Sequence, residues 1–269
     1  MDRGRVARSL VLASVVVLAG CSGLAGSDGS AVETLTPAPV PTAGPTYPPG
    51  VTASGVVAPV LADAHESRLL SAGFTLTSHR RVVGPEETLR RTRQTRRVAP
   101  GGETYVGEFT RSAPKYPLQS FPPLSLVYWT NGTVTAYHRE SARPPHSYAW
   151  TRGEPPTLDV TRADALERYL GAVETTVRER ERGVVLVGST VERPGAFRTL
   201  PDGDRPRDVS LTVRVSDAGV VTGWRLTYRV TVADRRVRVV REGRVTAVGR
   251  TAVERPAWVA AAEARRTGA

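Results

Sequence analysis

The stretch from Val209 to Val232, VSLTVRVSDAGVVTGWRLTYRVTV, alternates apolar and polar side chains in two runs separated by a turn. A period of two is the pattern of a strand that buries one face. The turn is expected at Asp217-Ala218-Gly219, so the stretch predicts an antiparallel pair of strands with one apolar face. The apolar positions are Val209, Leu211, Val213 and Val215, followed by Trp224, Leu226, Tyr228, Val230 and Val232.

Further strand patterns lie on both sides of this pair. Downstream, residues 237–241 and 245–251 continue the meander through a turn expected at Glu242-Gly243. Upstream, Asn131-Gly132 is typical of a type I′ hairpin turn, which would place Trp129 beside Val134. The upstream strands are expected over residues 74–83, 103–111, 124–130 and 133–138.

Two segments have helical periodicity. Apolar residues follow one side of a helical wheel over residues 56–72, and Gly73 offers a stop. A second helix is expected from Thr161, with Asp164 in a capping arrangement, to just before Gly183. The apolar positions of this second helix are Leu166, Tyr169, Leu170, Val173 and Val177.

The strand and helix patterns together predict the fold class. A one-faced antiparallel sheet needs a cover over its apolar side, and the two helices are available for it. We therefore expect an α+β fold, a curved, half-barrel-like antiparallel sheet covered by two helices. The segment from Pro256 predicts a short C-terminal helix with Trp258 packed back on the sheet.

The N-terminus has the layout of a secretory signal. Three arginines precede the apolar core Leu10–Leu18, and the small pair Ala19-Gly20 comes directly before Cys21. The core is shorter than the ~20 residues of a membrane-spanning helix. Leu18-Ala19-Gly20-Cys21 resembles the lipobox of bacterial and archaeal lipoproteins, which implies cleavage before Cys21, a lipid on its thiol and a membrane anchor. The alternative is an ordinary secretory signal followed by a chance cysteine.

The chain is expected to have three parts. Residues 1–20 form the lipoprotein signal peptide, and residues 21–50 carry the lipidated cysteine and a tether rich in proline, glycine and serine. From Val51 the composition is that of a globular protein, so residues 51–269 are expected to form one α+β domain. We expect the protein on the extracytoplasmic face of the cell membrane.

Order and short motifs carry two further resemblances. The order of the predicted segments is similar to that in the half-barrel carriers of the lipoprotein-sorting and mycobacterial glycolipid-carrier families. This order is a membrane anchor, a proline-rich tether, a helix, several strands, a second helix and a strand meander. This architecture implies a concave sheet that binds a hydrophobic molecule. YPPGV (47–51) and LADAH (61–65), with the lipobox and the TPAPVPT linker, resemble an uncharacterised group of haloarchaeal surface lipoproteins.

Arginine dominates the charge of the chain. Its 269 residues have a net charge of +11, and lysine and asparagine each occur once, at Lys115 and Asn131. A GC-rich genome explains arginine in place of lysine. The segment LRRTRQTRRV (89–98) is interpreted either as an exposed edge strand or as a contact for anionic head groups. Its arginines are Arg90, Arg91, Arg93, Arg96 and Arg97.

Motifs for catalysis and for cofactors are absent from the sequence. None of the four histidines lies in a metal-binding pair, and GxSxG and phosphate-binding loops are missing. We therefore expect no cofactor and no metal. His65, between Leu61 and Leu69, is interpreted as a hydrogen-bonded core histidine. Asn131-Gly132-Thr133 is also an N-glycosylation sequon, although the turn alone explains the asparagine.

The sequence supports three functional hypotheses. The first is a membrane-anchored, non-enzymatic lipoprotein that binds a lipid or another hydrophobic molecule. The second is a structural or interaction module of the cell envelope that recognises a protein or glycan. The third is a hydrolase. Nucleic-acid binding is disfavoured because the chain is exported and has no stacking-aromatic motif, and the oligomeric state is left open. An apolar cavity of several hundred cubic ångströms would favour the first hypothesis and a solid core the second.

Overall fold

The computed structural model describes residues 46–112, 123–140, 146–153, 159–197, 204–232 and 234–267. All of them belong to one compact unit, Gly44–Ala269. The expected signal peptide, Cys21 and the tether up to residue 45 lie outside the described residues, so their roles remain predictions. Tyr47, near the end of the expected tether, donates a hydrogen bond of 2.8 Å to Glu179 of the folded unit.

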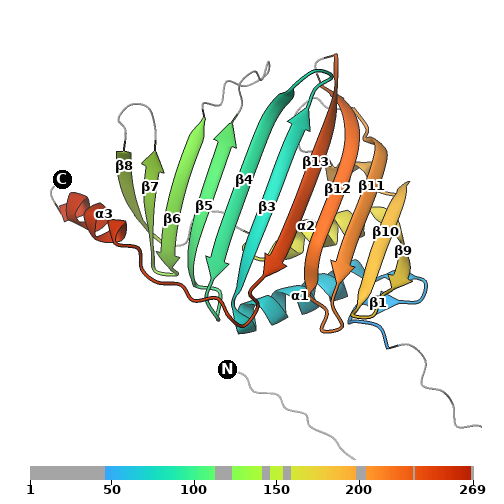
Figure 1. Ribbon diagram of the computed structural model, residues 1–269, viewed down its shortest axis with the longest axis horizontal. Helices are drawn as coiled ribbons and strands as arrows, with labels where there is room; N and C mark the ends of the chain where they lie inside the picture. Colours follow the sequence, from blue (N-terminus) through green and yellow to red (C-terminus); the bar gives the residue numbers. More distant parts are fainter. Residues whose placement is uncertain are drawn as a thin grey trace, which may run out of the picture. The chain divides into compact units, whose positions relative to one another are not determined.

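An open antiparallel sheet of eleven strands dominates the described residues (Figure 1). Its order is β8-β7-β6-β5-β4-β3-β13-β12-β11-β10-β9, with β8 and β9 at the two edges. A separate small hairpin joins β1 (Val51–Thr52) and β2 (Gly55–Val56). The strands of the large sheet are β3 (Phe74–Val83), β4 (Thr88–Val98), β5 (Thr104–Ser112), β6 (Leu124–Asn131), β7 (Val134–Glu140), β8 (His146–Arg152), β9 (Val173–Glu179), β10 (Val184–Val191), β11 (Arg207–Val215), β12 (Val221–Val232) and β13 (Arg235–Thr246).

The chain builds this sheet from the middle outward and then back. Strands β3 to β8 follow one another toward one edge, and β9 to β13 return from the other edge until β13 pairs with β3. The alternating stretch Val209–Val232 forms β11 and β12, as predicted, with Val213 opposite Trp224. The open antiparallel sheet agrees with the expected fold class.

Helices α1 (Ala58–Ala72) and α2 (Ala163–Leu170) cover the same face of the sheet (Figure 1), which we call the inner face. Helix α1 buries Leu61, His65 and Leu69, which are spaced four residues apart and therefore share one side. It ends at Gly73, whose positive φ of 72° suits glycine and whose N–H bonds to the Leu69 carbonyl. The first predicted helix is thus confirmed.

The third helix, α3 (Trp258–Thr267), packs on the opposite, outer face near the β8 edge (Figure 1). Its Val259 and Ala262 are buried in a second small core with Trp129 and Ala136, whereas Tyr128, one residue earlier on β6, faces the main core. The sheet is therefore covered on its inner face near its centre and on its outer face near one edge. Trp258 packs on this second core, as predicted.

The second predicted helix is much shorter than expected. Helix α2 ends at Leu170, and Val173 and Val177 lie on strand β9. The sequence VETTV is rich in β-branched residues, which favour a strand, and Gly171 closes the helix. Thr161 accepts a bond from the Ala163 N–H, and Arg162 occupies the position before the helix.

Glu242-Gly243 is not a turn, because β13 runs unbroken through it. Gly243 lies opposite Trp224 of β12, and a Cβ atom at Gly243 would come within 2.1 Å of the Trp224 ring. The glycine therefore makes room for an aromatic ring on the neighbouring strand. Gly107 of β5 plays the same part beneath the Tyr128 ring.

The hairpin at Asn131-Gly132 is confirmed, but its register differs from the prediction. Trp129 lies opposite Ala136 and not Val134. The Asn131 side-chain oxygen accepts bonds from the Thr133 and Val134 N–H groups, so a longer Asx-type turn replaces the two-residue loop. The shift by two residues leaves every side chain on the predicted face.

The basic segment 89–98 forms β4, which lies between β3 and β5 and not at an edge of the sheet. The edge-strand interpretation is therefore wrong. Its arginines do divide between the two faces. Arg91, Arg93 and Arg97 are exposed on the outer face, while Arg90 and Arg96 are on the inner face. The pleat separates neighbouring residues because successive strand side chains point to opposite sides.

Candidate functional site

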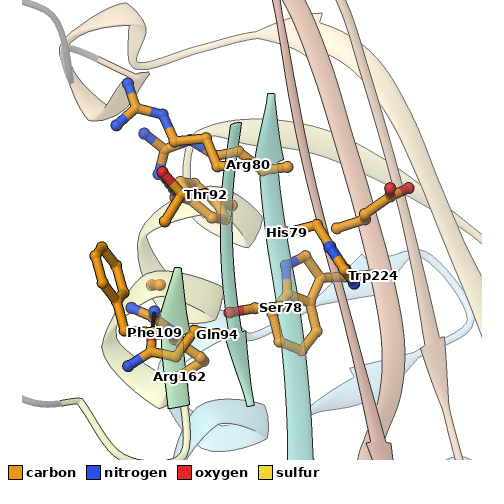
Figure 2. A pocket seen from close by; sticks show the side chains of 12 residues that line it. Ser78, His79, Arg80, Thr92, Gln94, Phe109, Arg162 and Trp224 are labelled. Atoms are coloured by element: carbon orange, nitrogen blue, oxygen red, sulfur yellow. Dashed lines mark hydrogen bonds between the residues drawn. The ribbon is translucent and has the colours of Figure 1, made fainter. Parts of the chain in front are cut away.

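The inner face carries a cavity of about 230 Å³ between α2 and the centre of the sheet. Figure 2 shows Phe109, Gln94 and Arg162 grouped together, and Trp224 beside Ser78. The polar residues that line it on this face are Ser78, Arg80, Thr92, Gln94, Arg162 and Arg241, and the apolar and aromatic ones are Phe109, Ala165, Tyr169 and Trp224.

Strand register brings the sheet residues together. Ser78 of β3 lies opposite Gln94 of β4, which lies opposite Phe109 of β5. In the next inward-pointing row, Arg80 of β3 lies opposite Arg241 of β13. Trp224 reaches the same region from β12 because Gly243 leaves space for its ring. The cavity is thus assembled from strands that are far apart in the sequence.

Helix α2 and the residue before it complete the wall. Arg162 has a φ of 70°, an uncommon backbone conformation for a residue with a side chain, and donates a 2.8 Å hydrogen bond to the Gln94 Oε1. Arg241 donates a hydrogen bond to the Tyr169 hydroxyl, and its guanidinium lies 5.7 Å from the centre of the Tyr169 ring. The two arginines therefore tie α2 to β4 and β13.

Guanidinium groups outnumber carboxylates among the residues that line the cavity. Burial lowers the pKa of Arg162, and the neighbouring charges of Arg96 and Arg241 lower it further. Asp159 is the nearby acid, and burial raises the pKa of its carboxyl group, which accepts a 3.2 Å bond from the Ala165 N–H. Arg80, Arg162 and Arg241 thus line the cavity, with the Asp159 carboxyl group behind Arg162 and Glu242 at the rim.

Arg96 supports the cavity from behind. It is 1% exposed, and its Nη1 donates to the carbonyl oxygens of Asp159 and Val160, at 2.7 and 3.1 Å. Its Nε donates to the Tyr128 hydroxyl at 3.3 Å, and this hydroxyl also accepts a bond from Gln94. Arg96 therefore fastens the segment before α2 to the sheet. The alternation of the basic segment predicted arginines on both faces but not a fully buried one.

The cavity differs from the apolar cavity of several hundred cubic ångströms that would favour a binder of a lipid or another hydrophobic molecule. It is smaller than the roughly 300–1,000 Å³ of typical ligand pockets, and arginines line it beside aromatic rings. A wider cleft of about 870 Å³ shares Arg162, Ala165, Tyr169 and Arg241 with it. The inner face is therefore neither a purely apolar chamber nor a solid core.

The outer face carries exposed arginines in the open part of the sheet. A shallow hollow of about 850 Å³ lies over Gly223, where the strand has no side chain, between Arg214 and Arg244. Glu242 at its rim forms ion pairs with Arg225 at 2.9 Å and Arg81 at 3.3 Å. The outward-facing members of the sequence-predicted basic set, Arg91, Arg93 and Arg97, share this face.

The histidines lie apart from one another on the described elements. His65 is buried in α1, and His79 of β3 lies opposite Glu242 of β13 in the strand register. The His138 ring stacks on the Tyr148 ring, with 4.8 Å between the ring centres. His146 begins β8. In the part of the chain that the structure describes, no three His, Cys, Asp or Glu side chains gather closely enough to hold a metal ion.

Asn131 lies exposed at the tip of the β6–β7 hairpin. Its glycosylation stays a prediction, which the intact mass of the natively purified protein would test. Cys21 lies outside the described residues, and so its lipidation stays a prediction as well. Among the described helices, none is both long enough and apolar enough to span a bilayer.

The fold defines a class of protein with an open, mostly antiparallel sheet, two inner helices and a basic cavity beneath them. Residues 6–262 match a family of unknown function, DUF7537, and the chain belongs to this family. Among solved structures it is similar to LprF from Mycobacterium bovis, with 12% identity and a TM-score of 0.37, over 74% of this chain and 96% of that one. No curated protein matches the chain.

Proposed function

We propose that this protein is a membrane-anchored, extracytoplasmic lipoprotein that binds a small, partly apolar molecule in its inner cavity and does not act as an enzyme. The observation that carries the proposal is the cavity between α2 and the sheet, where Phe109, Tyr169 and Trp224 provide apolar walls. The lipobox-like sequence before Cys21 supports the anchor, and the proline-rich segment after it supports a tether.

A partly apolar ligand fits this cavity better than a wholly hydrophobic one. Aromatic rings offer large apolar surfaces, while Ser78, Thr92 and Gln94 offer hydrogen bonds that fix an orientation. The open side allows the remainder of a larger molecule to extend into the wider cleft beside α2. We therefore propose an amphiphile as the ligand, in place of the hydrophobic molecule that the sequence predicted.

Extraction of the natively purified protein tests the proposal directly. Organic extraction followed by mass spectrometry is expected to recover one stoichiometric, non-covalently bound small molecule, because the lipid expected on Cys21 is covalent and stays with the chain. Ala165→Leu fills the cavity from α2 and should abolish this recovery, whereas Ala260→Leu changes an exposed alanine of α3 and should not. Recovery of no such molecule, or equal recovery from both variants, would contradict the proposal.

The outer face supports a second candidate function, an envelope module that docks on an anionic membrane surface. Arg91, Arg93 and Arg97 are exposed there, and lysine or arginine near a bilayer contributes about 1 kcal/mol each. Docking on an anionic membrane requires positive charge that is concentrated on one exposed face of the sheet.

Vesicle sedimentation in the Cys21→Ser background, which removes the lipid attachment, tests this second function. Binding to vesicles of phosphatidylglycerol and phosphatidylcholine should exceed binding to phosphatidylcholine alone and should weaken with salt. Arg91→Gln with Arg93→Gln should reduce binding. The matched pair Arg180→Gln with Arg182→Gln, in the exposed β9–β10 turn, should not. Equal binding by both double variants would remove the outer face from consideration.

A further inference from the structure

Arg162 and Arg241 of the inner cavity are only partly neutralised by the protein, with the Asp159 carboxyl group as the acid that acts on Arg162. Among the described residues, neither Arg162 nor Arg241 forms an ion pair with a carboxylate. Glu242, at the rim of the inner cavity, forms ion pairs with Arg81 and Arg225, whose side chains project from the outer face. The buried Nε of Arg241 has no hydrogen-bond partner in the described part of the chain. Burying cationic groups in this way is costly unless an anion neutralises them.

The same arginines are held in place by specific contacts. Gln94 accepts the Arg162 bond, and the Tyr169 hydroxyl accepts the Arg241 bond. Arg162 is kept at a positive φ of 70°, and unusual backbone conformations of this kind persist where the surrounding structure enforces them, often at ligand sites. The guanidinium groups are thus positioned before a ligand arrives.

We propose that the inner cavity is an anion-binding site in which Arg162 and Arg241 bind the phosphate, sulfate or carboxylate group of the ligand. This inference rests on the proposed ligand-binding function and adds the chemical class of the ligand. Guanidinium groups bind phosphate and carboxylate oxygens through paired N–H donors, which gives geometric specificity as well as affinity.

The dimensions of the cavity agree with an acidic head group. The cavity volume of about 230 Å³ lies below the roughly 300–1,000 Å³ of typical ligand pockets. A space of this size suits a phosphate group and the first carbon atoms behind it, and a longer chain would extend into the wider cleft beside α2. Trp224 and Phe109 line the same space and provide an apolar surface for the atoms that follow the head group.

Calorimetric titration of the full, natively anchored protein in detergent micelles, after removal of co-purified ligand, tests the inference with defined probes. Octyl phosphate is expected to bind at least tenfold more tightly than octyl glucoside, because the two share an apolar chain and differ in head-group charge. Inorganic phosphate should compete with octyl phosphate if the anion alone is recognised. An absence of competition with retained octyl phosphate binding would indicate that the lipid-like chain is also needed, which still supports the acidic head group.

Two variants locate the binding. Arg241→Gln and Arg162→Gln should each weaken octyl phosphate binding at least tenfold, with folding checked by circular dichroism. Arg244→Gln removes the same charge from the outer face of the same strand and should change affinity less than twofold.

If octyl glucoside binds as tightly as octyl phosphate, the anion site is wrong while the ligand-binding function stands. If neither probe binds and no ligand is extracted, both proposals fail. If a folded Arg241→Gln protein binds octyl phosphate as tightly as the wild type, the anion binds elsewhere and the inference is wrong.

Discussion

The imidazole of His65 accepts a hydrogen bond through Nδ1 from the backbone N–H of Val221, 3.1 Å away. Its other ring nitrogen, Nε2, lies 3.1 Å from the carbonyl oxygen of Thr161, to which it donates. One fully buried side chain therefore connects α1 to the start of β12 and to the segment before α2. Because that segment carries Arg162, the histidine also helps to hold the wall of the cavity.

The pH dependence of stability should reveal His65. Burial lowers the pKa of His65 from 6.5 to about 4. Between these values the unfolded chain binds more protons than the folded one, so the free energy of unfolding falls as the pH decreases. The loss should approach 1.4 kcal/mol per pH unit and total roughly 3 kcal/mol, complete below about pH 4. Urea denaturation from pH 8 to pH 3.5 measures it.

Two variants isolate this contribution from other titrating groups. His65→Gln should lower stability at pH 8 by about 2 kcal/mol, because a buried hydrogen-bonding group is lost, and should flatten the slope between pH 6.5 and 4. His138→Gln, in the half-buried ring stack with Tyr148, removes an imidazole away from the His65 site and serves as the matched control. A slope that survives in His65→Gln would assign the effect to another group.

We predict that Arg96 contributes to the stability of the fold and that its neighbour Arg97 does not. Arg96→Gln removes donors to Asp159, Val160 and Tyr128, and breaking such buried charged bonds costs about 2–4 kcal/mol. Arg97→Gln, with its side chain exposed on the outer face, should change stability by less than about 0.5 kcal/mol. Urea midpoints of the two variants, measured side by side, check the difference, and equal midpoints would refute the structural role of Arg96.

The period-two pattern predicted the sheet well because it depends on local geometry. Val209 to Val232 alternate so strictly that only one face can be buried, and β11 and β12 follow this pattern. The helical pattern was less reliable after Gly171. Val173 and Val177 are four residues apart, which suits one side of a helix, but they are also on the same face of a strand. The β-branched residues between them decided the outcome.

The cavity could not be predicted because its residues meet only through long-range pairing. Arg80 and Arg241 are opposite each other in the sheet because β13 returns from the far edge and pairs with β3. Glu242-Gly243 resembled a turn, since a glycine next to a polar residue is common in turns. The function of Gly243 depends on Trp224, an aromatic residue on another strand, which no local pattern identifies.

The anchor can be tested independently of the folded unit. If Cys21 carries the lipid, Cys21→Ser should move the protein from the membrane fraction to an unprocessed or soluble form. Ser22→Ala, one residue further on, should leave fractionation unchanged. Membrane fractionation with immunodetection is the measurement. A Cys21→Ser protein that fractionates like the wild type would mean that another element holds the protein at the membrane.

Gly243 should link stability to the shape of the cavity. A Cβ atom there would lie 2.1 Å from Trp224, and a rigid indole must move to relieve this contact, so Gly243→Ala should cost about 1–3 kcal/mol. Gly195 has nothing within 4 Å of the same added atom, and Gly195→Ala should stay within about 0.5 kcal/mol of the wild type. Because the displaced indole lines the cavity, Gly243→Ala should also weaken octyl phosphate binding, whereas Gly195→Ala should not. Denaturation midpoints and calorimetry check both expectations, and a Gly243→Ala protein as stable as Gly195→Ala would show that the Trp224 ring does not need the space above this glycine.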